Sequence, residues 1–283
     1  MSVDLDALAS PSARVAVIGG GKMGEAILGG WIKAQSGAAA PWSAACFTVV
    51  EPNDVRREYL EAEYGVHCVA DATEAGAADL FLLAVKPQVM PAVLPGIAAL
   101  PSAGGALFVS IAAGLSTAKL ESQLPEGAHL VRVMPNVALL VEKGATTLCA
   151  GSCATHEELS FVRDLFGCIG DAFIVDEGQM DITCAINGSG PAYAAAMVEA
   201  LAAAAAQAGL DADLAERLAA QTVFGAGALM AERGQSAEET RIAVSSPGGT
   251  TLAALAAMED GGFSESLAAG VRAAIARSKE LGA

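Results

Sequence analysis

Positive charge is scarce in this sequence of 283 residues. Lysine and arginine together number 16, against 32 aspartates and glutamates, so the net charge is −16. A chain this acidic is poorly suited to following a phosphate backbone, which disfavours a nucleic-acid partner. Net charge cannot attract an anionic cofactor either. Any such ligand must be held by local backbone amides and a few placed cations.

Clustered metal ligands are also missing. The six cysteines form no Cys-x-x-Cys pair, and His67, His129 and His156 stand far apart in the sequence. A metal site needs clustered ligands, so we expect no metal. The cysteines are expected to be free thiols in a reducing cytoplasm.

Long uninterrupted apolar runs are absent, although the mean hydropathy is +0.46. A membrane-spanning helix needs about 20 apolar residues in a row. The best candidate, residues 192–210, is mostly alanine and contains Glu199 and Gln207. We expect it to be a buried helix of a soluble protein. Residues 1–11 contain Asp4 and Asp6 but no basic region, so no secretory signal and no membrane partner are expected.

Aromatic residues make up 5% of the chain and charged residues 17%, whereas hydrophobic residues reach 53%. This composition excludes overall disorder and supplies a sizeable core. The length allows two domains at about 150 residues each. The large excess of alanine implies small side chains and closely packed helices.

In the first half of the chain, short apolar runs alternate with helical patterns. Strands are expected at residues 14–18, 47–50, 79–85, 106–111, 129–133, 146–150 and 172–175, and helices at 22–35, 54–63, 116–123 and 156–166. This alternation predicts a Rossmann-like, doubly wound parallel sheet. We assign residues 14–176 to this α/β dinucleotide-binding domain and residues 1–13 to a flexible tail.

Strand signals stop after residue 177. Helices are expected at 180–185, 191–208, 212–232, 237–243, 251–258 and 265–281, which predicts an all-α domain over residues 177–283. The helix at 191–208 is apolar nearly all round, and such a helix must be buried. About a hundred residues cannot easily bury so many apolar faces alone. We therefore expect this domain to associate with a second subunit as an obligate dimer.

A glycine-rich segment follows the first expected strand. Gly19, Gly21 and Gly24 fit the pattern Gly-x-Gly-x-x-Gly, with Lys22 and Met23 between the last two. The glycines permit a tight turn and a close backbone approach to a pyrophosphate, and the following helix supplies amides. The alternative is an ordinary glycine-rich turn, but the strand–turn–helix context favours a dinucleotide site.

Glu51 ends the second expected strand, 27 residues after Gly24. An acidic side chain at this point binds the ribose diol of NADH and repels the 2′-phosphate of NADPH. Arg56 and Arg57 follow closely, and either could reach a phosphate. The alternative is that both arginines are solvated at the start of a helix.

Two further segments end strands on the same edge of the predicted sheet, where ligands of doubly wound folds bind. The first is Ala84-Val85-Lys86-Pro87, in which proline fixes the turn. The second is the segment from Arg132 to Asn136. The alternative to a binding role for the first segment is an ordinary strand-end turn with an exposed lysine.

Two glycine-containing segments precede helices in the second half. Residues 187–193 include Gly188 and Ser189 before the long apolar helix, and residues 245–251 include Ser246 and Thr250. Two glycines, two threonine hydroxyls and a helix N-terminus together make a good cradle for a carboxylate. Taken singly, both segments would more often be plain helix caps.

Together these segments resemble the pyrroline-5-carboxylate reductase family from about residue 14 to residue 281. The resemblance rests on residues 18–24, 84–87, 131–136, 188–193, 246–251 and 261–263, which occur in the family's order and spacing. It implies a Rossmann domain followed by a helical domain that interlocks with a second subunit. It also implies an active site between the domains, completed at the dimer contact. Such dimers commonly form larger rings, often decamers.

The implied reaction is reduction of 1-pyrroline-5-carboxylate to L-proline by NADPH or NADH, the last step of proline biosynthesis. The resemblance assigns cofactor binding to Gly19, Gly21, Lys22, Met23, Gly24, Glu51, Ala84, Val85, Lys86, Pro87, Asn136, Gly188 and Ser189. It assigns substrate binding to Ser246, Gly248, Gly249, Thr250 and Thr251. Thr250 is the catalytic candidate beside the ring nitrogen, with Thr251 as its rival. Positioning, rather than acid–base machinery, would supply most of the acceleration.

The sequence departs from the family in three respects. Asn187 stands where serine is usual, residues 234–244 lack the common His-Pro pair and an aspartate, and alanine is unusually abundant. Other two-domain dehydrogenases, or an imine reductase for a related small carboxylate, are alternative readings. Dehydrogenases of 3-hydroxy acids need a catalytic lysine, and none occurs between Lys143 and Lys279. A dinucleotide-sensing or structural protein is a further alternative, which the intact 246–251 loop disfavours.

Overall fold

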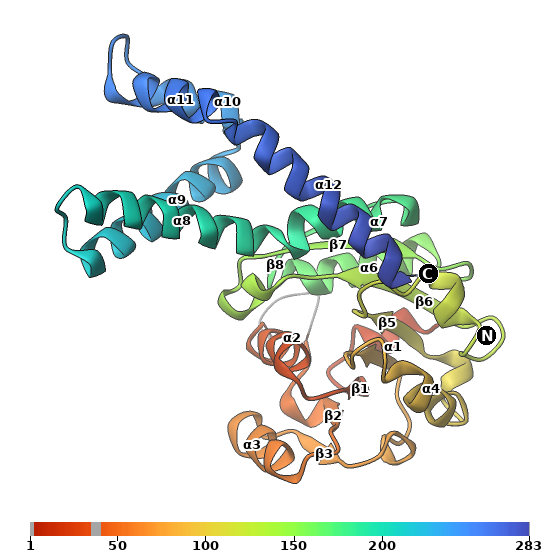
Figure 1. Cartoon of the computed structure of the whole chain (residues 1–283). Coiled ribbons are helices and arrows are strands. Elements are labelled where there is room, and N and C mark those ends of the chain that lie inside the picture. Colours follow the sequence, from red (N-terminus) through yellow and green to blue (C-terminus); the bar gives the residue numbers. More distant parts are fainter. Residues whose placement is uncertain (1–2, 35–40, 283) are drawn as a thin grey trace. The chain divides into compact units, whose positions relative to one another are not determined.

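The computed structural model describes residues 3–34 and 41–282 (Figure 1). Two compact units divide the chain: one ends at Gly188 and regains the residues from Ile275 onward, and the other is formed by residues 189–274. The sequence analysis placed the division at residue 176. The compact units divide later because the segment after residue 180 packs on the sheet, where the Thr183 hydroxyl lies 2.9 Å from that of Thr147.

The first unit is built on one eight-stranded sheet in the order β3-β2-β1-β4-β5-β6-β7-β8. The strands are β1 (Val15–Ile18), β2 (Phe47–Val50), β3 (His67–Val69), β4 (Leu80–Leu83), β5 (Leu107–Ser110), β6 (His129–Met134), β7 (Gly144–Ala150) and β8 (Gly170–Ile174). All neighbouring pairs are parallel except β6 and β7. The predicted α/β fold with a following helical unit is confirmed, and the purely parallel sheet is corrected.

The antiparallel β6–β7 pair follows from the length of its connection. Only residues 135–143 join the two strands, and they contain the short helix η4 (Val137–Val141). A parallel crossover needs about a dozen residues or more, so the chain turns back on itself instead.

Helices cover both faces of this sheet. They are α2 (Lys22–Lys33), α3 (Asp54–Tyr64), α4 (Met90–Ala98), α5 (Thr117–Glu121), α6 (His156–Gly167) and α7 (Met180–Thr183), with short helices η1 (Ala44–Cys46), η2 (Ala72–Glu74), η3 (Ala103–Gly105) and η5 (Glu177–Gln179). Val15 and Val17 of β1 pack in the core with α2 and α6. Ala16 and Ile18 point the other way, into the core with α4 and α5. Both faces are therefore apolar, as a buried strand requires.

The sequence analysis missed two elements of this unit and misjudged a third. Strand β3 has three residues, and helix α4 contains two prolines, so neither shows a clear period. Of the predicted flexible tail, residues 3–13 are described. Helix α1 (Leu5–Leu8) forms there, Leu8 is fully buried, and its carbonyl accepts a hydrogen bond of 2.8 Å from Trp42 Nε1. A four-residue helix with one buried leucine shows no periodic pattern, so the sequence could not predict it.

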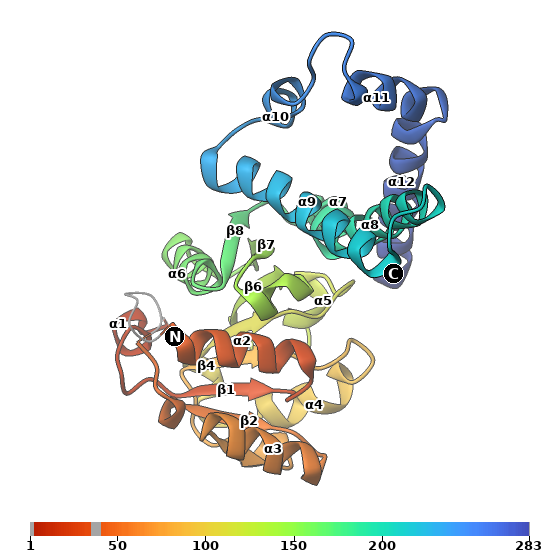
Figure 2. The same cartoon turned by 90° about the vertical axis from the view of Figure 1, so that its left-hand side faces the viewer.

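The second unit is helical, as predicted. It comprises α8 (Gly190–Gln207), α9 (Ala212–Arg233), α10 (Ala237–Ala243), α11 (Thr250–Asp260) and the beginning of α12 (Phe263–Gly282), whose last residues belong to the first unit. Helices α8 and α9 lie side by side as a helical hairpin (Figure 2). Gly209, with φ of +102°, makes the turn between them.

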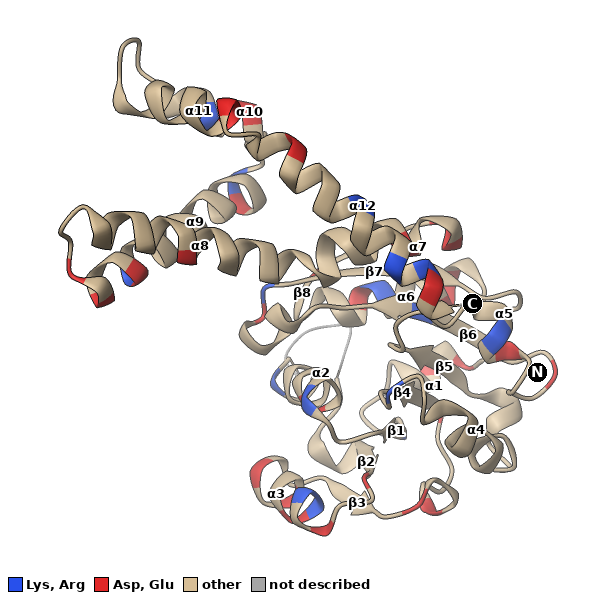
Figure 3. Cartoon of the chain, viewed as in Figure 1, with Lys and Arg blue, Asp and Glu red and all other residues tan. Residues whose placement is uncertain are grey.

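The second unit buries little of its apolar surface within the chain. Its exposed large hydrophobic residues are Met197, Leu201, Leu210, Leu214, Leu218, Phe224, Leu229, Met230, Ile242, Val244, Leu252, Met258, Phe263 and Leu267. Charged residues are sparse along α8 and α11 (Figure 3). A surface of this kind marks a protein–protein contact, which agrees with the expected self-association. No helix in the described ranges is long and apolar enough to cross a membrane.

Candidate active site

The glycine turn between β1 and α2 brings backbone into direct contact with backbone. Gly19 has φ of +110°, and a Cβ added there would lie 2.9 Å from the carbonyl oxygen of Ala84. A Cβ on Gly24 would lie 2.1 Å from the carbonyl oxygen of Gly19. Both positions therefore require glycine, and they press the N-terminus of α2 against the ends of β1 and β4.

Gly21 differs from these two glycines because its surroundings are open. It precedes the first residue of α2, no side chain caps the helix there, and nothing lies within 4 Å of an added Cβ. The first amides of an α-helix lack partners inside the helix and attract anions. This uncapped cradle fits the pyrophosphate of a dinucleotide.

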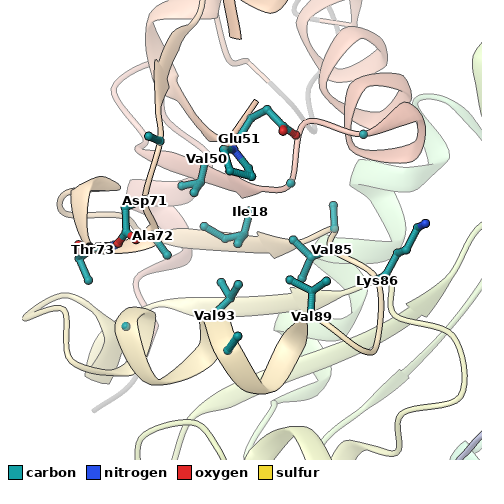
Figure 4. Close-up of a pocket in the computed structure, with 17 residues that line it drawn as sticks. Ile18, Val50, Glu51, Asp71, Ala72, Thr73, Val85, Lys86, Val89 and Val93 are labelled. Atoms are coloured by element: carbon teal, nitrogen blue, oxygen red, sulfur yellow. Dashed lines mark hydrogen bonds between the residues drawn. The ribbon is translucent and has the colours of Figure 1, made fainter. Parts of the chain in front are cut away.

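A pocket of about 520 Å³ lies beside this turn, at the carboxyl ends of β1, β2 and β4 (Figure 4). Its lining residues are Ile18, Gly19, Gly21, Val50, Glu51, Pro52, Ala70, Asp71, Ala72, Thr73, Ala84, Val85, Lys86, Val89, Ala92, Val93 and Gly96. The strand order reverses between β1 and β4, and crevices at such switch points bind ligands in open α/β sheets. Asp71 and Thr73 lie at one end of the pocket and Lys86 at the other.

Several of these lining residues were not predicted from sequence. Asp71 and Thr73 follow the missed strand β3, and Val89 and Val93 stand beside or on the missed helix α4. The Asp71 carboxylate accepts hydrogen bonds from the Thr73 amide and hydroxyl, at 2.9 and 2.6 Å. Only the identification of β3 and α4 in the sequence could have pointed to them.

Glu51 faces the pocket and is anchored to the glycine turn. One carboxylate oxygen accepts a hydrogen bond of 3.1 Å from the Gly20 amide, and the other accepts one of 3.0 Å from the Asn53 amide. Each oxygen keeps a further lone pair. The position therefore suits an acceptor for a ribose hydroxyl.

The two nearby arginines are engaged elsewhere. Arg56 Nε donates to the Gly20 carbonyl at 2.7 Å, and its guanidinium pairs with Glu25. Arg57 donates to the backbone carbonyl of Glu51 at 2.8 Å and to Asp54 at 2.6 Å. Neither arginine lines the pocket, and both are engaged by carboxylates and backbone carbonyls. They therefore brace the turn, instead of reaching a phosphate or being simply solvated at the start of the helix.

Glu25 is the carboxylate that holds Arg56 in this arrangement. Burial raises its pKa, but hydrogen bonds from Arg56, Tyr59 and Tyr64 outweigh burial and leave the pKa below its ordinary value. Glu25 is therefore ionised at neutral pH. It keeps the Arg56 guanidinium beneath the turn and away from the pocket.

A second, smaller pocket of about 280 Å³ shares Ala84, Val85 and Lys86 with the first. Its other lining residues are Met23, Pro87, Ile111, Ala112, Ala113, Met134 and Pro135. The two pockets together match an elongated ligand with a pyrophosphate near its middle. The loop at Ile111–Ala113 was not predicted.

Several predicted cofactor residues line neither pocket. Lys22 is exposed at the start of α2, and Asn136 is buried without lining either pocket. The Asn136 side chain accepts from the Ala138 and Ala145 amides and donates to the Asn187 carbonyl. Gly188 ends the first unit and Ser189 begins the second. Their roles, like those of all the predicted site residues, stay predictions.

The predicted substrate loop lies in the second unit, before α11. The Gly249 amide donates to the Ser246 carbonyl at 3.0 Å, and Gly248 has φ of +72°. With proline in between, this is a type II turn. Gly249 caps α11 without a side-chain hydrogen bond. Thr250 is exposed, whereas Thr251 is half-buried.

No metal-ligand cluster occurs among residues 3–34 and 41–282. All six cysteines are free, and burial raises the pKa of Cys68 and of Cys149 to about 11. Both thiols are therefore protonated at neutral pH and are poor nucleophiles.

A pocket at the switch point of a Rossmann-like sheet, followed by an apolar helical unit, is the architecture of a two-unit nicotinamide-dependent oxidoreductase. Residues 14–114 match the family model described as NADP oxidoreductase, coenzyme F420-dependent, and residues 177–281 match the one described as pyrroline-5-carboxylate reductase dimerisation. The chain belongs to the pyrroline-5-carboxylate reductase family.

Individual relatives agree over nearly the whole chain. Pyrroline-5-carboxylate reductases of Synechocystis and Mycobacterium tuberculosis are each 38% identical, covering 96% and 95% of this chain and 99% and 97% of their own length. The solved reductase of Coxiella burnetii is 33% identical, with a TM-score of 0.88 over 96% of this chain and 99% of that one. The Plasmodium falciparum reductase, solved with NADP bound, is 27% identical, with a TM-score of 0.82 over 96% and 99%.

The open surroundings of Gly21 give the first prediction. Gly21→Ala should fold normally, because its Cβ meets nothing, yet the methyl group would occupy the cradle beside the helix amides. We expect the NADH dissociation constant to rise at least about tenfold, or about 1.4 kcal/mol. Gly105→Ala is the control, since a Cβ there also meets nothing and Gly105 lines neither pocket. Fluorescence titration with NADH measures both; unchanged affinity in Gly21→Ala would place the pyrophosphate elsewhere.

Glu51 gives the second prediction, which concerns cofactor choice. We expect both cofactors to be used, with Glu51→Ser raising the NADPH-to-NADH ratio of kcat/KM by about tenfold. The substitution removes a charge that repels a 2′-phosphate and an acceptor for the ribose. Glu74→Ser is the control, because Glu74 is exposed nearby but does not line the pocket. Steady-state kinetics with the two cofactors decides; an unchanged ratio means that Glu51 does not read the ribose.

Proposed function

We propose that this protein reduces 1-pyrroline-5-carboxylate to L-proline with NADPH or NADH, as the last step of proline biosynthesis. One observation carries the proposal: a pyrophosphate cradle and an uncapped, glycine-rich carboxylate loop occur in one chain that belongs to this family. The absence of a lysine between Lys143 and Lys279 disfavours a 3-hydroxy-acid dehydrogenase.

The reaction requires little from the protein beyond placing the imine against the nicotinamide. A cyclic imine is already electrophilic, and its C=N bond takes a hydride at carbon and a proton at nitrogen. The bound nicotinamide supplies the hydride. The Gly249 amide is engaged by the Ser246 carbonyl, so the Thr250 and Thr251 amides at the uncapped start of α11 would hold the carboxylate. The exposed Thr250 hydroxyl would stand beside the ring nitrogen. Proximity and orientation can contribute up to about 7–11 kcal/mol.

The self-association follows from the dimerisation match and the exposed apolar helices. We further propose that dimers assemble into a larger ring, of the decamer type that the resemblance implies. A reducing, cytoplasmic location is proposed as well, supported by six cysteines that are all free.

The reaction itself is tested spectrophotometrically. We expect oxidation of NADH and of NADPH on addition of 1-pyrroline-5-carboxylate, with L-proline as the product identified by mass spectrometry. A small 3-hydroxy acid with NAD⁺ or NADP⁺ serves as the contrasting substrate. Turnover of the hydroxy acid without turnover of the imine would overturn the proposal, and so would cofactor binding with no turnover of either.

The role of Thr250 is tested by removing one hydroxyl at a time. Thr250→Val keeps the shape and loses a hydrogen bond made mainly in the transition state, so turnover should fall more than KM rises. We expect a loss of about tenfold to a hundredfold, or roughly 1.4–2.7 kcal/mol. Thr251→Val is the matched control, because adjacent helical residues point about 100° apart. Near wild-type turnover in Thr250→Val would leave carboxylate binding by backbone amides alone.

A further inference from the structure

Asn187 is a buried amide that none of the chemistry above uses. It lies in the π-helical turn η6 (Cys184–Gly188), directly after α7, and is 8% exposed. Single π-helical turns are rare and often occur at functional sites. The inner position of Asn187 in this turn directs its side chain at the sheet rather than at solvent.

The Asn187 side chain bridges the two strands of the antiparallel pair where they diverge. Its Nδ2 donates to the Met134 carbonyl at 2.7 Å and to the Ala145 carbonyl at 2.9 Å. The last residue pair of the β6–β7 ladder joins Met134 to Thr147. The amide therefore closes the sheet at the point where the ladder ends.

A second amide locks the first. Asn136 Nδ2 donates to the Asn187 carbonyl at 3.0 Å, and Asn136 Oδ1 accepts from the Ala145 amide at 3.3 Å. Asn187 Oδ1 has no hydrogen-bond partner among the described residues. The geometry thus uses Asn187 for its two N–H donors, which neither aspartate nor serine can supply in the same number.

The clamp formed by the Asn187 and Asn136 side chains acts on the wall of the smaller pocket. Met134 and the following Pro135 both line that pocket. Gly188 touches the same wall, since an added Cβ would lie 2.7 Å from Met134 Cε. Movement of the π-turn would therefore shift the wall directly.

We propose that Asn187 is a positioning residue that holds the Met134–Pro135 wall for the nicotinamide half of the cofactor. It acts through the wall and not through contact with the adenosine half, which lies in the larger pocket. The inference rests on the proposed function only in placing a nicotinamide in the smaller pocket. A misplacement of about 1 Å at a reacting group can lower the reaction rate on the order of 100-fold, so a residue that fixes the pocket wall affects how well the nicotinamide is placed.

The test compares two ligands that share the adenosine half. ADP-ribose lacks the nicotinamide, so it reports on the larger pocket alone, whereas NADH reports on both. Calorimetric titration of the wild type and of Asn187→Ala, Asn187→Ser and Asn187→Asp gives both dissociation constants. We expect NADH binding to weaken about tenfold in the alanine variant and more in the aspartate variant, with the serine variant between wild type and alanine. ADP-ribose binding should stay within about twofold.

Glu158→Gln is the control for general loss of stability. A carboxylate oxygen of Glu158 lies 2.9 Å from His129 Nδ1 in a buried position, and Glu158 lines neither pocket. The substitution should therefore destabilise the fold and change the dissociation constants of NADH and ADP-ribose by the same factor. Equal weakening of both ligands in the Asn187 variants, or unchanged NADH binding, would overturn the inference. Because both measurements are of binding, they do not depend on turnover of 1-pyrroline-5-carboxylate, and a failure of the proposed reaction remains distinguishable.

Discussion

The approach of Gly24 to Gly19 is the constraint on which the rest of the site depends. Two backbones can come this close only without Cβ atoms, and the contact pins the N-terminus of α2 at the edge of the sheet. The turn then presents the Gly20 amide to Glu51 and the Gly20 carbonyl to Arg56. A cradle fixed in this way binds with less loss of conformational freedom than a mobile loop would.

A chain of net charge −16 must still bind an anionic dinucleotide, and the arrangement of local charge explains how. The uncapped start of α2 offers amides, and Lys86 lies where the two pockets meet. Arg56 and Arg57 do not add to this attraction, because Glu25, Asp54 and backbone carbonyls engage them. We therefore expect binding to depend on oriented backbone amides rather than on surplus positive charge, as helix N-termini permit.

The sequence could predict the features that repeat a local pattern. The strand–glycine–helix unit, the strand ends at Glu51 and Lys86, and the helices of the second half are of this kind. Features set by distance across the fold were out of reach. Nothing local marks β7 as antiparallel, and Asp71 joins the pocket only because a three-residue strand ends there.

Asn136 shows the same limit from the other side. Its place after a strand predicted contact with the cofactor, and that role stays a prediction; the structure shows its side chain hydrogen-bonded to the Ala138 and Ala145 amides and the Asn187 carbonyl. A polar residue at a strand end can serve the ligand or the wall that holds the ligand. The sequence predicts where Asn136 lies in the fold but not which group it hydrogen-bonds, because hydrogen bonds between residues 51 apart in the chain have no local signature.

The helical unit completes the physical account. Its two buried residues, Ala215 and Ala219, are small, while large side chains such as Leu218 and Phe224 face outward in the single chain. The first unit, by contrast, has a core on each face of its sheet. Abundant alanine gives α8 and α9 high helix propensity and lets helices approach closely, but it buries too little area to stabilise the unit by itself. The helices can form locally, and the self-association that the dimerisation match supports gives their outward apolar side chains a surface to pack against, which links the stability of this unit to binding of a second copy.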